Sequence, residues 1–419
     1  MSVSSGGIIP QERALKKQIL TPSGKGDNII KFFAGRRPNT LKMKRLENNS
    51  RRLLERIPLF KKAKVLVIGD FILDRFVWGK VERISPEAPV PVVHVQRESY
   101  MPGGSLNVAH NIHTLGGTVI PCGIVGRDWE GRMLLKILRR QAIDSGGIVY
   151  EKDRPTTLKT RVIAHSQQVV RFDREKIQAV SEEARRKILK FIRQKMAGVD
   201  AVVIEDYGKG MIEPVLVKEI LRLAKKFTKP ILVDPKEKHF SYYRGVTAIT
   251  PNRKEAYSGF ASYAPRSAEA NGRERSLEEV GRGLLRHLKC EAVLITLGEG
   301  GMALFEKDGS VTKIPTAARE VYDVSGAGDT VIAVFALALA AGAKKREAAM
   351  LSNLAAGVVV AKLGTATVTP EELKASLLNA GAGLSATQTA DPSRHRGGTS
   401  RLYGRASSGG KPAPAVFEK

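Results

Sequence analysis

Four short apolar runs, separated by amphipathic segments, constrain the fold of this chain most strongly. The runs cover residues 64–70, 201–204, 230–233 and 292–296. Runs of this length, bounded by glycine or polar residues, are typical of buried parallel strands. Residues 181–197 and 213–227 show helical spacing of apolar residues with charged outer faces. This alternation predicts an α/β fold over residues 61–380, with a doubly wound, mostly parallel sheet covered by helices on both faces.

Residues 79–101 depart from this alternation because they are extended and rich in proline. Pro86, Pro89 and Pro91 stand among valines, and proline disfavours a helix but is tolerated in edge strands. The alternating stretches 157–163 and 167–172 can pair with this segment. The sequence therefore predicts a small β-sheet lid, formed by about 79–101 and 157–173, beside the main sheet.

The two ends of the chain differ in composition from the predicted domain. Residues 1–60 carry a net charge of +9, and residues 381–419 carry +4 and are rich in Gly, Ser, Pro and Arg. We expect a disordered basic extension over 1–60, a surface loop over 262–275 and a low-complexity tail over 381–419. Residues 61–380 also carry a positive net charge, which suits anionic small substrates. Nucleic acid is the less favoured partner, because few aromatic residues accompany the charges of the tails.

Cysteine content and apolar run length limit the cellular setting. Cys122 and Cys290 are the two cysteines, both beside apolar residues, so we expect core thiols in a reducing compartment. No apolar run reaches the roughly 20 residues of a membrane helix, and the N-terminus lacks the apolar centre of a signal peptide. We therefore expect a cytoplasmic protein without a membrane partner. A transit peptide is the less favoured reading of the Arg-rich start.

A glycine-rich motif opens the apolar segment 331–341 and reads Val324-Ser325-Gly326-Ala327-Gly328-Asp329-Thr330. Its glycines allow a tight turn and a close approach to a ligand, and the first N–H groups of the following helix can bind an anion. Asp329 in the first turn could accept a proton from a hydroxyl that attacks phosphorus. The motif favours phosphoryl transfer, although an aspartate at this position can also serve only as a helix cap.

Further polar residues follow other predicted strands, at the edge where open α/β sheets bind ligands. They are Asp70, Asp74, Gly103, Gly104, Asn107, Lys209, Lys236, Asn252 and Glu255. Carboxylates and the Asn107 amide suit sugar hydroxyls, and the two lysines suit an anion. Asn252 and Glu255 stand three residues apart, where they could order the water shell of a metal ion. Each residue alone has an ordinary structural alternative, so the inference depends on their convergence.

Together these motifs resemble the ribokinase-like (PfkB) family of carbohydrate kinases over residues 61–380. Two family signatures match Gly103-Gly104 with Asn107, and residues 323–330. The resemblance implies ATP and Mg²⁺ as cofactors and leaves a monovalent cation open. It implies Asp329 as the catalytic base and an anion hole formed by Gly326, Ala327 and Gly328. The implied sugar contacts are Asp74, Gly103, Gly104 and Asn107. Asn252 and Glu255 would be tied to magnesium through water, and ATP would be bound by Thr296, Gly298, Gly301 and Asn353.

Three longer strings resemble those of D-glycero-β-D-manno-heptose-7-phosphate kinases within this family. They are residues 83–92, 205–210 and 357–365. The resemblance implies phosphorylation of the anomeric hydroxyl of the heptose phosphate, on a route to ADP-heptose and lipopolysaccharide. The candidate cations for the 7-phosphate are Arg83, Arg161, Lys209 and Lys236. Some relatives carry an adenylyltransferase as well, an activity that we do not expect from the polar tail.

Two alternatives to this function stay open. One is a kinase of the same family that acts on another sugar or sugar phosphate, and the other is a nucleotide-binding protein without catalysis. The lid strands have edges that need a partner, which predicts a homodimer formed through the lid.

Overall fold

Nine strands form the main sheet of the computed structural model, which describes residues 50–165, 167–263 and 275–386. Their order is β13-β12-β11-β10-β9-β8-β1-β4-β5. In this order they are Val311–Ile314, Met302–Glu306, Ala292–Thr296, Ala248–Ile249, Ile231–Asp234, Ala201–Glu205, Lys64–Gly69, Thr118–Gly126 and Gly147–Glu151. All neighbouring pairs from β11 to β5 are parallel, and β12 and β13 are antiparallel additions at one edge. The predicted mostly parallel sheet is confirmed.

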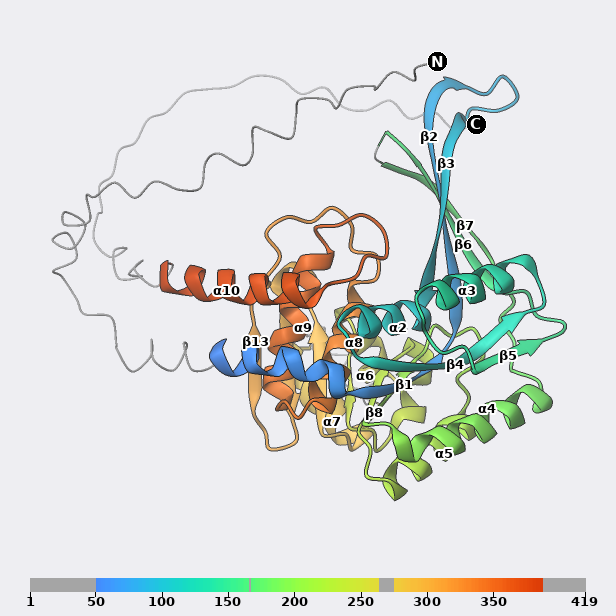
Figure 1. The fold of residues 1–419 in the computed structure, drawn as a ribbon. Coiled ribbons are helices and arrows are strands. Elements are labelled where there is room, and N and C mark those ends of the chain that lie inside the picture. The colour runs from blue at the N-terminus through green and yellow to red at the C-terminus, as the bar shows by residue number, and fades with distance from the viewer. Residues whose placement is uncertain (1–49, 166, 264–274, 387–419) are drawn as a thin grey trace, which may run out of the picture. The chain divides into compact units, whose positions relative to one another are not determined.

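Helices cover both faces of this sheet (Figure 1). One face carries α2 (Ser105–Thr114), α3 (Trp129–Arg140), α8 (Ala327–Ala340), α9 (Lys345–Val359) and α10 (Pro370–Ala386). The other carries α4 (Glu182–Lys195), α5 (Pro214–Lys226), α6 (Arg253–Ala261) and α7 (Leu277–Leu288). In β1, Val65 and Val67 face the first group while Leu66 and Ile68 face the second. Both faces of the strand are buried, which explains its unbroken apolar sequence.

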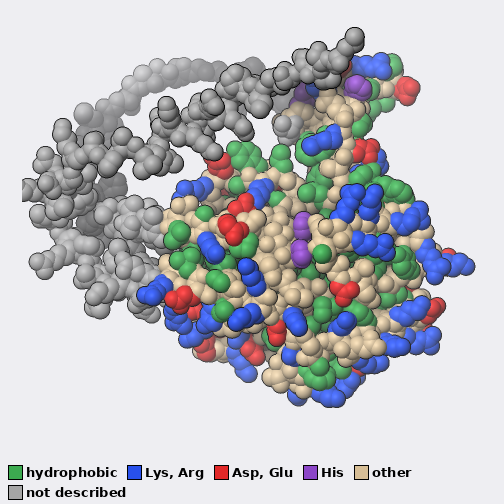
Figure 2. Space-filling view, in the orientation of Figure 1, with side chains coloured by type: hydrophobic (Ala, Val, Ile, Leu, Met, Phe, Trp, Pro, Cys, Tyr) green, Lys and Arg blue, Asp and Glu red, His purple; other side chains and the backbone are tan. Residues whose placement is uncertain are grey.

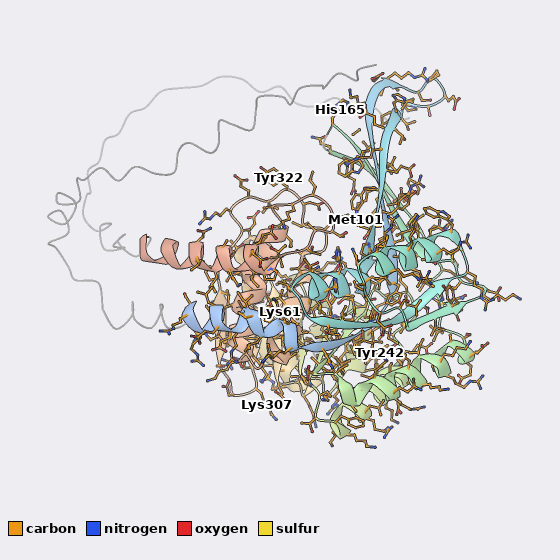
Figure 3. All side chains as sticks on the ribbon, in the orientation of Figure 1. Lys61, Met101, His165, Tyr242, Lys307 and Tyr322 are labelled. Atoms are coloured by element: carbon orange, nitrogen blue, oxygen red, sulfur yellow. The ribbon has the colours of Figure 1, made fainter. Side chains whose placement is uncertain are left out.

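A second sheet of four strands, in the order β3-β2-β6-β7, forms the lid. These strands are Pro91–Gly104, Phe71–Ile84, Thr157–Ala164 and Gln167–Arg174. Figure 1 shows them extending away from the main sheet, and Figure 3 places Met101 near their base and His165 farther out. The predicted small second sheet is confirmed. Its strand β2 begins at Phe71, before the predicted residue 79, because β2 follows β1 after a single residue.

The described structure also extends beyond both predicted ends of the domain. Residues 50–56 are helical, although they fall within the expected N-terminal extension. Leu53, Ile57 and Phe60 are buried in the core, at spacings of four and three that place them on one helix face. The intervening charged residues concealed this pattern. Helix α10 likewise continues to Ala386, and residues 1–49, 264–274 and 387–419 of the predicted extension, loop and tail lie outside the described residues.

The predictions on cysteine and charge can be compared with the described residues. Cys122 and Cys290 are free and buried, and burial raises the pKa of each thiol to about 12. They are core thiols, as predicted. Figure 2, drawn in the orientation of Figure 1, shows that Lys and Arg side chains are spread over the visible surface among scattered Asp and Glu. No helix in the described ranges is both long and apolar enough to cross a membrane.

Candidate active site

The first turn of α8 fixes the carboxylate of Asp329. Gly326 caps this helix at φ +78°, and a Cβ there would collide with the side-chain amide of Asn107, so glycine is needed at this position. Asp329 Oδ2 accepts a hydrogen bond from Asn107 Nδ2 at 2.6 Å, and Oδ1 accepts one from the Tyr207 hydroxyl at 2.7 Å. The carboxylate is therefore held across three elements, and among the described residues no side chain caps α8.

The environment of Asp329 strengthens it as a base. The residue is 4% exposed, and burial raises its pKa above that of an ordinary aspartate, while the bonds from Tyr207 and Asn107 oppose this shift. The same burial and the neighbouring charge of Asp329 raise the pKa of Tyr207, so its hydroxyl keeps its proton and acts as a donor. Of the three predicted anion-hole N–H groups, that of Ala327 donates to the Val324 carbonyl at 3.2 Å, and those of Gly326 and Gly328 have no acceptor among the described residues. A buried carboxylate beside such N–H groups can accept a proton from a bound hydroxyl.

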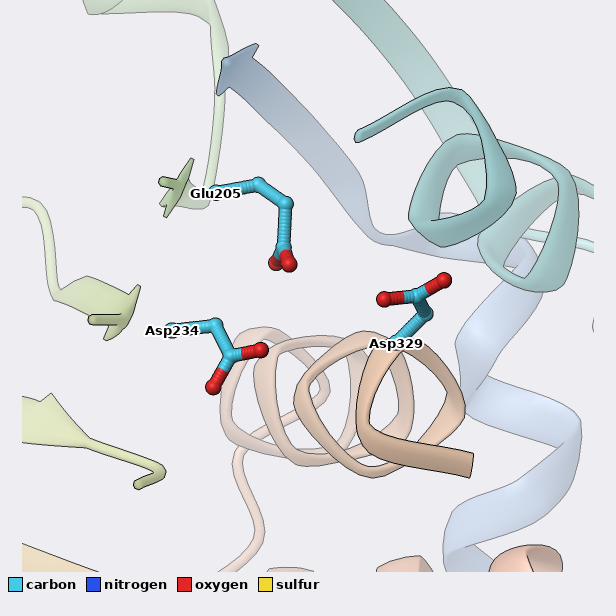
Figure 4. A group of neighbouring side chains, drawn as sticks. All are labelled: Glu205, Asp234 and Asp329. Atoms are coloured by element: carbon cyan, nitrogen blue, oxygen red, sulfur yellow. The ribbon is translucent and has the colours of Figure 1, made fainter. Parts of the chain in front are cut away.

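Three carboxylates from different elements meet beside α8 (Figure 4). Glu205 ends β8, Asp234 ends β9, and their oxygens lie within 4.8 Å of one another and of an Asp329 oxygen. Glu205 is 1% exposed, and its Oε2 has no hydrogen-bond partner among the described residues. Burial, followed by the neighbouring carboxylates, raises the pKa of Glu205 and of Asp234. Hard oxygen ligands and an unpartnered buried oxygen fit a divalent cation such as Mg²⁺.

Asn252 and Glu255 border this acidic cluster. They form a capping box at the start of α6, in which each side chain accepts the other residue's backbone N–H. The charge of Glu255 raises the pKa of Asp234, and burial raises the pKa of Glu255 itself. The predicted pair thus has a structural role in α6, and Glu255 also adds negative charge to the edge of the cluster.

The lid contributes a second group of charged side chains. Asp74 of β2 is 3% exposed and forms an ion pair with Arg161 of β6. A Cβ on Gly103 would collide with the Asp74 carboxylate, and Gly104 takes φ +58° where β3 passes into α2. The two glycines let the backbone close around Asp74.

A tight loop after β8 positions Tyr207 and Lys209. The carboxylate of Asp70 accepts backbone N–H bonds from Tyr207 and Lys209 at 3.1 Å and from Met211 at 3.2 Å. Burial raises the pKa of Asp70 to about 6. The sequence grouped Asp70 with Asp74 as a possible ligand, but Asp70 fixes this loop. The Lys209 ammonium extends away to Glu175, at 2.7 Å.

The residues predicted around ATP come from the end of β11, from the turn that follows it and from α9. Thr296 forms a bridge with Asn252, and Gly298 lies in the exposed turn that follows. A Cβ on Gly301 would collide with the backbone of Ile314, and Asn353 donates to the carbonyl of Pro315 at 2.8 Å. Gly301 and Asn353 therefore shape the walls of this region.

Comparison with known proteins decides the family. The model of the pfkB family carbohydrate kinases matches residues 62–372. The chain belongs to the pfkB family. The proteins named bifunctional protein HldE from Wolinella succinogenes and Geobacter sulfurreducens are each 45% identical to it, over 74% of this chain and 63% and 62% of their own lengths. This chain therefore spans less than two thirds of those relatives.

Solved structures agree with the pfkB assignment at the level of the fold. Ribokinase from Thermotoga maritima has a TM-score of 0.57 at 21% identity, covering 76% of this chain and 99% of that one. Phosphofructokinase-2 from Escherichia coli in complex with potassium has a TM-score of 0.60 at 17% identity, covering 76% and 98%. The ribokinase-like fold inferred from the sequence is confirmed.

Some residues of this pfkB site were not singled out in the sequence. One candidate for binding the 7-phosphate, Arg83, lies far from Asp74. Tyr207, Glu205 and Asp234 stand in strings that the sequence analysis quoted or bordered, but only the fold reveals their contacts with Asp329. Lys159 was taken as part of a lid strand. Arg83 lies nine residues beyond Asp74 on β2, about 30 Å along an extended strand, and is exposed. Lys236 is exposed beside Gly208, and its charge opposes the rise in the pKa of Glu255, so it lies at the border of the acidic cluster.

Proposed function

We propose that this chain transfers the γ-phosphoryl group of ATP to the anomeric hydroxyl of D-glycero-β-D-manno-heptose 7-phosphate, on the route to ADP-heptose. Membership of the pfkB family supports a carbohydrate kinase. Identity of 42–45% with several HldE proteins, and the three strings at 83–92, 205–210 and 357–365, support the heptose substrate. The observation that carries the proposal is the Asp329 carboxylate, held by Asn107 and Tyr207 at the N-terminus of α8.

The site residues suggest how the phosphoryl group is transferred. Asp329 accepts the proton of the anomeric hydroxyl as its oxygen forms a bond to the γ-phosphorus. The bond between that phosphorus and the β,γ-bridging oxygen breaks, and ADP leaves. The N–H groups of Gly326 and Gly328 stabilise the negative charge that develops on the transferred group, and the N–H of Ala327 can join them only when its hydrogen bond to the Val324 carbonyl opens. On the lid side, Asp74 and the Gly103-Gly104 backbone would hold the hydroxyls of the sugar.

The acidic cluster of Glu205 and Asp234 fits the magnesium ion that a kinase uses with ATP. These two side chains would hold it, with Glu255 acting through ordered water. Bound magnesium neutralises phosphate charge and polarises the oxygens of the transferred group. ATP would lie across Thr296, Gly298 and Gly301. The potassium complex of a neighbour of similar fold makes a monovalent cation a candidate further cofactor.

The exposed edges of the lid sheet support a homodimer. The proposed substrates support a cytoplasmic location. Strand β7 is exposed throughout, including Val170 and Phe172, and pairing with a second lid would cover this apolar edge. ATP and sugar phosphates, the proposed substrates, are cytoplasmic metabolites.

An acceptor panel tests the proposed function. Heptose 7-phosphate, ribose, fructose 6-phosphate and sedoheptulose 7-phosphate are each supplied with ATP and Mg²⁺, and kcat/KM is compared. We expect a strong preference for the heptose phosphate. Preference for another acceptor would leave a pfkB kinase of different specificity. ATP binding without turnover of any acceptor would instead indicate a nucleotide-binding protein.

A further inference from the structure

The lid places one lysine in the site without a carboxylate partner. Lys159 of β6 stands opposite Asp74 across the β2–β6 ladder and opposite Asp173 across the β6–β7 ladder. Within the described residues it forms no ion pair with either, and its Nζ lies 5.2 Å from the ring centroid of Tyr207 instead. Burial, followed by the charge of Lys209, lowers the pKa of Lys159, and the charges of Asp74 and Asp173 oppose this shift without forming an ion pair, as expected for a partly desolvated ammonium.

Two other basic side chains near Lys159 already form ion pairs with carboxylates. Arg161 is paired with Asp74. Lys209 is paired with Glu175. Both pairs are largely buried, with side chains between 4% and 20% exposed. An incoming anion would have to compete with a bound carboxylate at either residue, whereas at Lys159 it would meet a free ammonium.

The position of Lys159 relative to Asp329 indicates which anion it would bind. One face of the Tyr207 ring contacts the ammonium, while the hydroxyl of the same ring reaches Asp329. The acidic cluster, where we place the phosphates of ATP, lies with Asp329 at the main sheet. Lys159 belongs to the lid, on the side of Asp74. A sugar with its reacting hydroxyl at Asp329 and its other hydroxyls at Asp74 would extend toward the lid.

We propose that Lys159 is the centre of a subsite for a phosphate monoester at the far end of the acceptor. This inference rests on the proposed function, because a phosphorylated sugar must be the acceptor. The phosphate supplies the counter-charge that Lys159 lacks, and the lysine makes the enzyme prefer the phosphorylated sugar over the free sugar. Lys159 is thus a specificity-determining residue rather than part of the proton transfer.

The test compares two acceptors with variants of Lys159. Heptose 7-phosphate and the same heptose without phosphate are assayed with wild type, Lys159→Met and Lys159→Arg. Lys152→Met, an exposed lysine on the loop before β6, is the matched control. Loss of one charge-assisted contact predicts a rise of roughly 10- to 100-fold in KM for the heptose phosphate in Lys159→Met. We expect kcat/KM for the free heptose to stay within about threefold, and Lys159→Arg to recover much of the loss.

Each other outcome has a distinct meaning. An equal fall in kcat for both acceptors would place Lys159 at the transferred phosphoryl group and overturn the subsite, as would unchanged kinetics. The affinity of each variant for ATP reports whether the fold is intact, and the conservative arginine variant provides the test if the methionine variant is unstable. If wild-type enzyme shows no preference for heptose 7-phosphate, the proposed function fails. The Lys159 comparison can then be repeated with whichever phosphorylated acceptor is used.

Discussion

The two halves of the site differ in how their charges are balanced. At the main sheet, Glu205, Asp234 and Asp329 bring three carboxylates together, with Glu255 at their border. At the lid, Asp74 and Glu175 are each paired with a cation, and Lys159 remains without a carboxylate. The first half therefore has an excess of negative charge, with Lys236 as a nearby cation at Glu255, and the second has one ammonium more than it has carboxylate partners. A metal ion bound with ATP would balance the carboxylates, and the phosphate of a sugar phosphate would balance the lysine. The charges of the two halves therefore indicate which kind of ligand each half binds.

This contrast is specific to the site and is not a general property of the sheet edge. Asp206, the neighbour of Glu205 in the sequence, accepts hydrogen bonds from the Tyr243 hydroxyl and from His239 Nδ1. These two partners come from the short helix 237–243, and the backbone N–H of Gly208 is a third donor, at 2.7 Å. One strand end thus carries a carboxylate with three donors next to a carboxylate with an unpartnered oxygen. At this strand end, the carboxylate that faces the acidic cluster keeps an unpartnered oxygen, and its neighbour is bonded to the surrounding fold.

The largest effect is expected from Asp329→Asn, which removes the proposed base but keeps the shape of the side chain. The turnover number should fall on the order of 10² to 10⁴, while ATP still binds. Steady-state kinetics with the heptose phosphate measures this. Asp308→Asn, in the exposed turn between β12 and β13, is the control and should retain wild-type activity. Turnover near the wild-type level in Asp329→Asn would remove this residue from the mechanism.

The second prediction concerns Asp234→Asn, which should reduce the negative charge of the acidic cluster and so weaken the binding of Mg²⁺. Removing one negative charge from the cluster weakens its attraction for a divalent cation, so the free Mg²⁺ concentration for half-maximal rate should rise roughly tenfold. The rate is measured against free Mg²⁺ at saturating ATP and acceptor, with Glu183→Gln, an exposed residue of α4, as the control. A normal magnesium requirement combined with a raised acceptor KM would assign Asp234 to the sugar instead.

Asp74→Asn should disturb the lid half alone. The change weakens hydrogen bonds to a sugar hydroxyl and releases Arg161 from its ion pair, so the acceptor KM should rise roughly tenfold while the ATP KM stays within about twofold. Glu82→Gln is a matched control, because Glu82 is exposed toward the far end of the same lid strand β2. An effect of Asp74→Asn on the ATP KM equal to that on the acceptor KM would contradict the division of the site into two halves.

The smallest effect concerns the paired carboxylate Asp206. Its hydrogen bond to His239, at 2.6 Å, raises the pKa of that histidine above 6.5. Because the folded-state pKa is raised, the pair stabilises the fold fully below pH 6.5 and loses this contribution as pH rises through the folded-state pKa. Urea unfolding between pH 6 and 8.5 should show a small fall in the free energy of unfolding that is absent in His239→Gln. The same pH slope in both proteins would contradict this pairing.

The sequence predicted the main sheet well because parallel strands buried on both faces have continuous apolar runs. It was less informative about the first helix, where exposed Arg51 and Arg52 precede Leu53. It also could not reveal the role of Lys159. That residue faces the site because β6 pairs with β2 in the register that sets Lys159 opposite Asp74, and this register comes from tertiary packing.

The metal side shows the same limit. Asn252 and Glu255 were recognised by their spacing, which the structure uses for a capping box. Glu205 and Asp234 end adjacent strands, but their approach to Asp329 depends on where α8 packs against the sheet. Local patterns identified which segments carry polar residues, and the fold determined which of their side chains meet.

The most direct test of this account is to identify the product by ³¹P NMR. The chain is incubated with ATP, Mg²⁺ and heptose 7-phosphate, and the spectrum is followed over time with Asp329→Asn in parallel. We predict a new anomeric phosphate signal that grows with ADP while the 7-phosphate signal persists, and that is absent with the variant. Release of inorganic phosphate without a second sugar phosphate, or a new phosphate at another carbon, would contradict the proposed reaction.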